Sequence, residues 1–125
     1  LAKFAAKVRK GQPKFRAKLR ELYDDQCALS GWGPPEVLEA AHICSHAESG
    51  VNHSSNGLLI RADIHCLMAG GLLRIEPDTL AIRLDEKLRE TQYWGLDGQT
   101  LRSRVDGSRP STEYLQLRFV ESVDI

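Results

Sequence analysis

Several features that sort proteins into broad classes are scarce or missing in this chain. Cysteine occurs only three times in 125 residues, at Cys27, Cys44 and Cys66, an odd number without paired spacing. This count argues against a secreted disulfide framework and fits a reducing compartment, so we expect a cytoplasmic, or at least intracellular, protein. The sequence has no apolar run of about eighteen residues, the length that a membrane-spanning helix needs. It begins with Leu1 and shows no signal-peptide pattern, which suggests a domain taken from a longer protein.

Acidic residues are absent from the first twenty positions, although the formal net charge of the whole chain is zero. These positions carry eight of the seventeen lysines and arginines. Such a basic segment can bind phosphates even on a neutral protein; the alternative is a solvated helix face with no ligand. The candidates for phosphate contacts are Lys14, Arg16, Lys18 and Arg20 and, further along the chain, Arg61.

An apolar content of 42% over this length predicts one globular domain. Gly11 interrupts a helix-compatible start, so residues 1–11 are interpreted as a basic linker or upstream extension and residues 12–125 as the domain. Pro13 is typical of the first position of a helix. The apolar stripe expected on that helix consists of Phe15, Leu19, Leu22 and Tyr23.

The remaining pattern predicts an α+β fold. Residues 27–29 and 37–43 read as an antiparallel hairpin around a turn rich in Gly and Pro, with a further strand at 58–60. A helix is expected at 61–68, ended by Gly70 and Gly71, then a second hairpin of 72–75 and 80–84, and a closing helix up to residue 120. Residues 85–93 fit either extended chain or a short helix.

All four histidines lie within residues 38–71, at His42, His46, His53 and His65. The predicted order around them is strand, polar loop, strand and helix, and Asn56 stands just before the second strand. Imidazoles and an amide that converge in this way favour a metal-assisted hydrolytic site over a packing core. A neutral imidazole, with an ordinary pKa of about 6.5, suits the deprotonation of water, and a divalent cation suits the stabilisation of charge.

These residues carry a resemblance to a known family. The segments AAHI at 40–43, NGLLI at 56–60, ADIH at 62–65 and GLLRI at 71–75 resemble the HNH endonucleases. The resemblance implies a ββα-metal core over about residues 37–71, with flanking helices and an extra β-hairpin. It further implies that His42 is the general base, that Asn56 positions it through a hydrogen bond, and that His65 is a metal ligand.

The resemblance also implies partners. DNA is the usual substrate of the family, and the subgroup resembled here supplies the C-terminal cleavage domains of restriction-type enzymes, including modification-dependent ones. An upstream recognition domain is therefore expected in the full-length chain. A membrane is not expected among the partners. A double-strand cut usually needs two active sites, which favours a homodimer.

The sequence departs from the family pattern at two ligand positions, where Ala41 and Ala69 replace side chains that bind metal in many members. His65 is then the one ligand that can be assigned, and a hydrated cation such as Mg²⁺ is favoured over Mn²⁺, Ni²⁺ or Zn²⁺. His46, His53 and Asp63 are candidates for further metal or substrate contacts. The alternative is a catalytically weak or inactive HNH-like module that only binds DNA. Of four positions for a structural zinc, Cys27 alone has a ligand, which argues against that ion.

Overall fold

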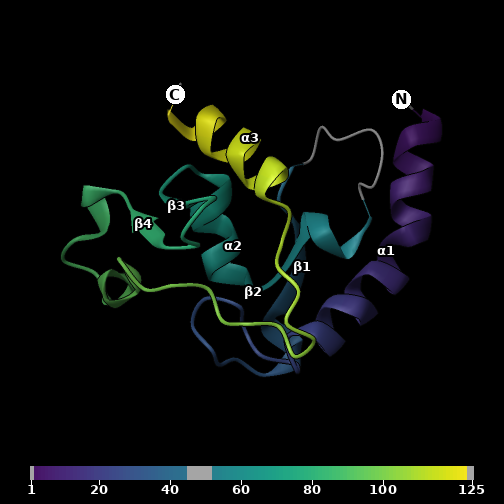
Figure 1. The fold of residues 1–125 in the computed structure, drawn as a ribbon, viewed down its shortest axis with the longest axis horizontal. Helices are drawn as coiled ribbons and strands as arrows, with labels where there is room; N and C mark the ends of the chain where they lie inside the picture. The colour runs from purple at the N-terminus through teal and green to yellow at the C-terminus, as the bar shows by residue number, and fades with distance from the viewer. Residues whose placement is uncertain (1, 45–51, 124–125) are drawn as a thin grey trace.

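The computed structural model describes residues 2–44 and 52–123 and has the α+β class expected from the sequence (Figure 1). Two small antiparallel sheets are combined with α-helices and short 3₁₀ turns. The elements in chain order are α1 (Ala2–Leu22), β1 (Leu38–His42), β2 (Gly57–Arg61), α2 (Ala62–Ala69), β3 (Leu73–Ile75), β4 (Ile82–Leu84) and α3 (Thr112–Val123). No helix in these described ranges is both long and apolar enough to cross a membrane.

The predicted helix start at Pro13 is wrong. Helix α1 begins at Ala2 and continues through both Gly11 and Pro13. A proline inside a helix lacks the N–H of the backbone ladder and bends the axis. Figure 1 shows the two halves of α1 running in different directions. A proline preceded by glycine resembles a helix start in sequence, and local signals do not separate a start from a bend. The domain boundary at residue 11 stays a prediction.

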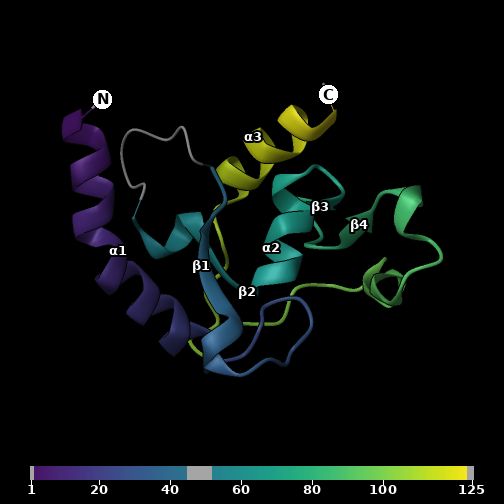
Figure 2. The same ribbon diagram turned by 180° about the vertical axis from the view of Figure 1, so that it is seen from behind.

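Strands β1 and β2 lie at the centre of the molecule. They pair antiparallel, with Leu38 opposite Arg61 and His42 opposite Gly57. Helix α1 packs on one face of this pair and α2 on the other (Figure 2). The apolar stripe predicted on α1 is confirmed, because Phe15, Leu19, Leu22 and Tyr23 are all buried.

The predicted hairpin of residues 27–29 with 37–43 is wrong, since β1 pairs with β2 instead. The segment around Ala28 is buried as irregular chain. The Ala28 N–H donates to the carbonyl of Leu59 (2.7 Å), and the Ala28 carbonyl accepts from the N–H of Arg102 (2.9 Å). A three-residue apolar run indicates burial but does not reveal which segment satisfies its backbone.

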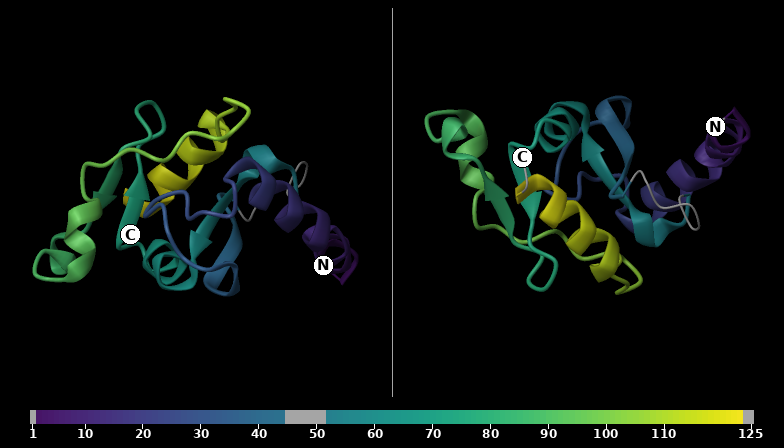
Figure 3. Two further views of the ribbon diagram at one scale, coloured as in Figure 1. Left: turned by 90° about the horizontal axis from the view of Figure 1, so that it is seen from below. Right: turned by 90° about the horizontal axis from the view of Figure 1, so that it is seen from above.

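The second sheet pairs β3 with β4, with Leu73 opposite Leu84 and Ile75 opposite Ile82. Helix α3 lies against β3 (Figure 3). The segment that the sequence left undecided forms two 3₁₀ turns, Glu86–Leu88 and Gln92–Leu96. These turns extend the molecule on the side of α2 away from α1 (Figure 1).

One cation, Arg104, is buried between α1 and the start of β2. Its Nε donates to the hydroxyl of Tyr23 (2.9 Å), and its Nη2 donates to the carbonyls of Ser54 and Gly57 (2.9 Å each). A buried guanidinium needs such partners, because burying it without them is costly. Burial raises the pKa of Tyr23, so its hydroxyl stays protonated. Arg104 thus fixes the chain just before β2.

Candidate functional site

His42 is the last residue of β1 and is half-buried. Its ring stacks on Phe15 of α1, with ring centres 4.6 Å apart and planes 7° from parallel. Its Nε2 lies 3.0 Å from Oδ1 of Asn52. Because an amide oxygen accepts, Nε2 carries the proton and Nδ1 is the nitrogen able to take one. Sequence reasoning missed Asn52, which stands among polar loop residues without a distinguishing pattern.

Asn56 is fully buried and holds the loop that joins β1 to β2. Its Nδ2 donates to the carbonyl of Cys44 (3.0 Å), and its Oδ1 accepts from the N–H of Cys44 (2.8 Å). Although a hydrogen bond from Asn56 to His42 was expected, none joins these two side chains among the described residues; the bonds that the amide makes to Cys44 are to backbone two residues beyond His42. Asn56 thereby contacts the main chain just after β1. Spacing along the sequence does not show which of two nearby groups an amide bonds.

His65 lies one turn into α2 and is partly exposed. Its Nδ1 is 2.8 Å from Oε1 of Glu39, which is on β1. The carboxylate accepts, so Nδ1 carries the proton and Nε2 keeps a lone pair for another partner. Histidines that bind metals in proteins commonly donate their second nitrogen to a carboxylate in this way. Glu39 was not among the expected residues, although it interrupts the apolar run of its strand, and that interruption was the available signal.

The structure does not bring His42 and His65 into contact. Successive side chains of a strand point to opposite faces, so Glu39 and His42, three residues apart, point to opposite sides of the sheet. His42 faces α1 through Phe15, whereas Glu39 holds His65 on the side of α2. Among the described residues, no three His, Cys, Asp or Glu side chains are grouped to hold a metal ion. The pair that does meet is Glu39 with His65.

The other candidate ligands have varied surroundings. His46 lies outside the described residues. His53 is exposed, and its Nδ1 bonds the Ser55 hydroxyl (2.8 Å) and accepts from the Ser55 N–H (3.1 Å). Asp63 is paired with Arg61 and also accepts from the hydroxyl of Tyr93 (2.7 Å). Its two oxygens are therefore engaged within the protein and do not face His65.

Three of the arginines expected to contact phosphates have partners inside the protein. Arg16 donates from Nη1 to the carbonyl of Leu38 (2.9 Å), Arg20 is paired with Asp25, and Arg61 is paired with Asp63. The acids cancel the charges of Arg20 and Arg61, whereas Arg16 keeps its own. Lys14 and Lys18 are exposed. Among the five candidates these two lysines and Arg16 are the ones whose charge is not cancelled by a paired acid.

The segment that holds this arrangement also matches a known family. Residues 27–76 match the family model described as HNH endonuclease. Through this segment the chain is similar to the HNH endonucleases. The HNH segment contains His42, Asn52, Asn56 and His65, together with Glu39, whereas Phe15 lies before it. No curated protein matches the chain. This similarity indicates nuclease activity in general.

The Arg61–Asp63 pair of the HNH segment predicts a pH dependence of stability. Hydrogen bonds from Arg61, then from Tyr93, lower the pKa of Asp63 from 3.8 to about 2. A carboxyl whose pKa is depressed on folding stabilises the protein above its unfolded pKa, and this contribution is lost as the pH falls towards the folded pKa. We therefore expect Asp63→Asn to lower the free energy of unfolding at neutral pH by about 1 kcal/mol or less, because the pair is partly exposed.

The difference between Asp63→Asn and wild type should shrink as the pH falls from 3.8 towards about 2. Urea denaturation across this interval measures it. Asp78→Asn, at an exposed acid, is the matched control and should show no such convergence. A constant difference in the free energy of unfolding between Asp63→Asn and wild type across this interval would contradict a lowered pKa of Asp63.

Proposed function

We propose that this chain is a metal-dependent DNA endonuclease domain that hydrolyses phosphodiester bonds. The observation that carries the proposal is the Glu39–His65 pair, which leaves His65 Nε2 with its lone pair available on a partly exposed ring. Two antiparallel strands followed by a helix, β1, β2 and α2, form the surroundings of that pair, as in a ββα-metal core. The proposal includes the role of cleavage module in a restriction-type or modification-dependent enzyme, with an upstream recognition domain and a homodimer for double-strand cuts.

The donors present fit a weakly held divalent cation. His65 would hold it through Nε2, with Glu39 keeping the ring in the correct tautomer. A site with few protein donors and several waters suits Mg²⁺, while Mn²⁺, Ni²⁺ and Zn²⁺ accept imidazole nitrogen more readily. When bound, the cation would supply Lewis-acid stabilisation of charge on the phosphate oxygens.

His42 would act as the general base in this proposal, which requires the phosphate to lie past the end of β1, within reach of both faces of the β1–β2 pair. Asn52 holds the proton on Nε2, so Nδ1 would take a proton from the attacking water as its oxygen bonds to phosphorus. The bond from phosphorus to the leaving oxygen breaks, and that oxygen is protonated from solvent. The stack on Phe15 keeps the imidazole in one orientation. Asn56 would support this position by holding Cys44, two residues beyond the base.

The role of Glu39 gives a test of the metal centre. We expect Glu39→Gln to raise the metal concentration needed for half-maximal plasmid cleavage about 10- to 100-fold, because the amide is a weaker acceptor for His65 Nδ1. Cleavage of supercoiled plasmid is measured against increasing Mg²⁺, Mn²⁺, Ni²⁺ or Zn²⁺, with EDTA as the blank. Glu36→Gln, at an exposed acid on the turn before β1, is the matched control. Equal metal requirements in wild type and Glu39→Gln would remove the proposed role of the pair.

A second candidate function is an HNH-like module that binds DNA with little or no catalysis. Two observations favour it: alanine at both ligand positions, Ala41 and Ala69, and the placement of His42 and His65 on opposite faces. Salt-dependent DNA binding without cleavage in any of the four metals would support this candidate. Ala69→Asp would then place a carboxylate four residues after His65, on the same helix face. Cleavage gained by Ala69→Asp would identify the missing ligand as the cause.

A further inference from the structure

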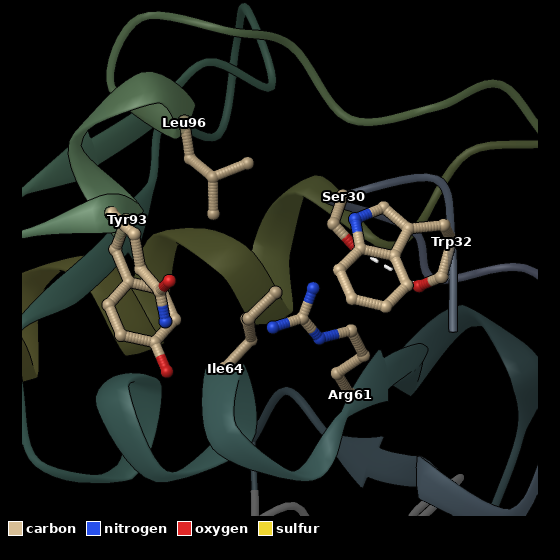
Figure 4. A pocket seen from close by; sticks show the side chains of 7 residues that line it. Ser30, Trp32, Arg61, Ile64, Tyr93 and Leu96 are labelled. Carbon is tan, nitrogen blue, oxygen red and sulfur yellow. Dashed lines mark hydrogen bonds between the residues drawn. The ribbon is translucent and has the colours of Figure 1, made fainter. Parts of the chain in front are cut away.

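A cavity of about 290 Å³ opens beside the start of α2. Trp32 and Arg61 form one side, Tyr93 and Leu96 form the other, and Ile64 lies between them (Figure 4). Segments far apart in the chain therefore meet here: the turn before β1, the end of β2 and the 3₁₀ turn Gln92–Leu96. Its volume is near the lower end of the range for small-molecule pockets.

Trp32 is the most unusual part of this cavity. The residue is 62% exposed, although it is one of the largest apolar side chains of the protein. The guanidinium of Arg61 lies 4.2 Å from the centre of one of its rings. Exposed tryptophan rings are uncommon away from binding surfaces, and an aromatic ring beside a guanidinium plane is a surface on which other flat groups stack.

The arginine beside the ring is held firmly. Nε and Nη2 of Arg61 both donate to Asp63, and Asp63 also accepts from the hydroxyl of Tyr93 (2.7 Å). Nη1 of Arg61 has no hydrogen-bond partner within residues 2–44 and 52–123 and remains a donor beside the cavity. Because Asp63 cancels the charge of Arg61, this place offers little attraction for a phosphate. It offers a flat surface and directional donors.

The lining of the cavity also includes polar groups. Ser30 contributes a hydroxyl and Gln92 an amide, in addition to Nη1 of Arg61. The flat or apolar side chains Trp32, Tyr93, Leu96 and Ile64 form the rest of the lining. A nucleobase has the complementary design, with two flat faces and donors and acceptors around its edge. Proteins recognise unpaired bases by stacking on aromatic or guanidinium planes and by hydrogen bonds to these edges.

We propose that this cavity binds a single unpaired base of a DNA strand. The proposal rests on the proposed function, because it takes DNA as the substrate. The cavity lies where β2 ends and α2 begins, and α2 is the helix that carries His65. A base held here selects strands in which that base is unpaired or can be turned out of the helix.

Tryptophan fluorescence tests the proposal directly, because the chain has only two tryptophans. In the Trp94→Phe variant Trp32 is the reporter, and in Trp32→Phe the reporter is Trp94, which does not line the cavity. Each variant of the whole chain is titrated in EDTA with a short single-stranded oligonucleotide and with an abasic oligonucleotide of equal length and charge. We expect the base-containing strand to quench Trp32, and neither strand to quench Trp94.

Binding affinity provides the second measurement. Trp32→Ala should weaken binding of the base-containing strand on the order of ten- to a hundredfold, because one stacked base is lost, and leave abasic binding unchanged. Circular dichroism verifies that the variant is folded. Equal quenching of Trp32 by both strands, or no quenching, would overturn the proposal. EDTA prevents metal-dependent cleavage, so the titration measures binding alone. If the base-containing strand quenches Trp32 but the chain cleaves no DNA in any metal, the proposed nuclease activity is contradicted and the proposed base site is supported.

Discussion

His42→Ala is expected to lower metal-dependent plasmid cleavage by about 10²- to 10⁴-fold, the usual contribution of a general base. The physical reason is that, in the proposed mechanism, Nδ1 of His42 takes the proton of water while Asn52 occupies Nε2. The measurement is the initial rate of nicking of supercoiled plasmid at saturating metal. The fold should persist, because the ring is only half-buried at the end of β1.

Glu90→Ala is the control for this prediction, since Glu90 is exposed and lies outside the HNH segment. It should cleave as well as wild type. Asn52→Ala should lower cleavage less than His42→Ala does. It should also shift the pH profile of cleavage, because Nε2 of His42 loses its hydrogen bond to Asn52. Cleavage by His42→Ala at the wild-type rate would exclude His42 as the base.

Gly57→Ala is expected to lower the free energy of unfolding by about 1–3 kcal/mol, the usual cost of overpacking a dense core. A Cβ atom on Gly57 would lie 2.6 Å from Cζ of Phe15 and 2.7 Å from Cδ1 of Leu19, which are buried side chains of α1. The backbone of Gly57 is ordinary extended chain, so the cost comes from contact and not from its dihedral angles. Urea denaturation measures the change.

Gly95→Ala is the control, because a Cβ there meets no atom within 4 Å. It should leave stability close to that of wild type. Gly57 lies opposite His42 in the sheet, and Phe15 touches both residues. We therefore expect Gly57→Ala also to reduce cleavage by displacing the ring under His42. A variant as stable as wild type would show that α1 is not packed on β2 as described.

Local patterns in the sequence account for much of this protein. The apolar spacing on α1 predicted its buried stripe, and Gly70 with Gly71 marked the end of α2. The spacing of His42, Asn56 and His65 pointed to the HNH family, which the matched segment confirms. These features are encoded over a few residues, because helical periodicity, caps and short motifs depend on neighbours in the chain.

The tertiary structure decided which side chains meet. It paired β1 with β2 and not with residues 27–29, joined Glu39 to His65, placed Asn52 on His42, and directed Asn56 to Cys44. It also left Trp32 exposed beside a cavity and Gly57 beneath Phe15. Each of these contacts depends on the face to which a strand residue points and on the element packed against that face. Spacing along the chain specifies the face, whereas packing of the whole domain specifies the partner.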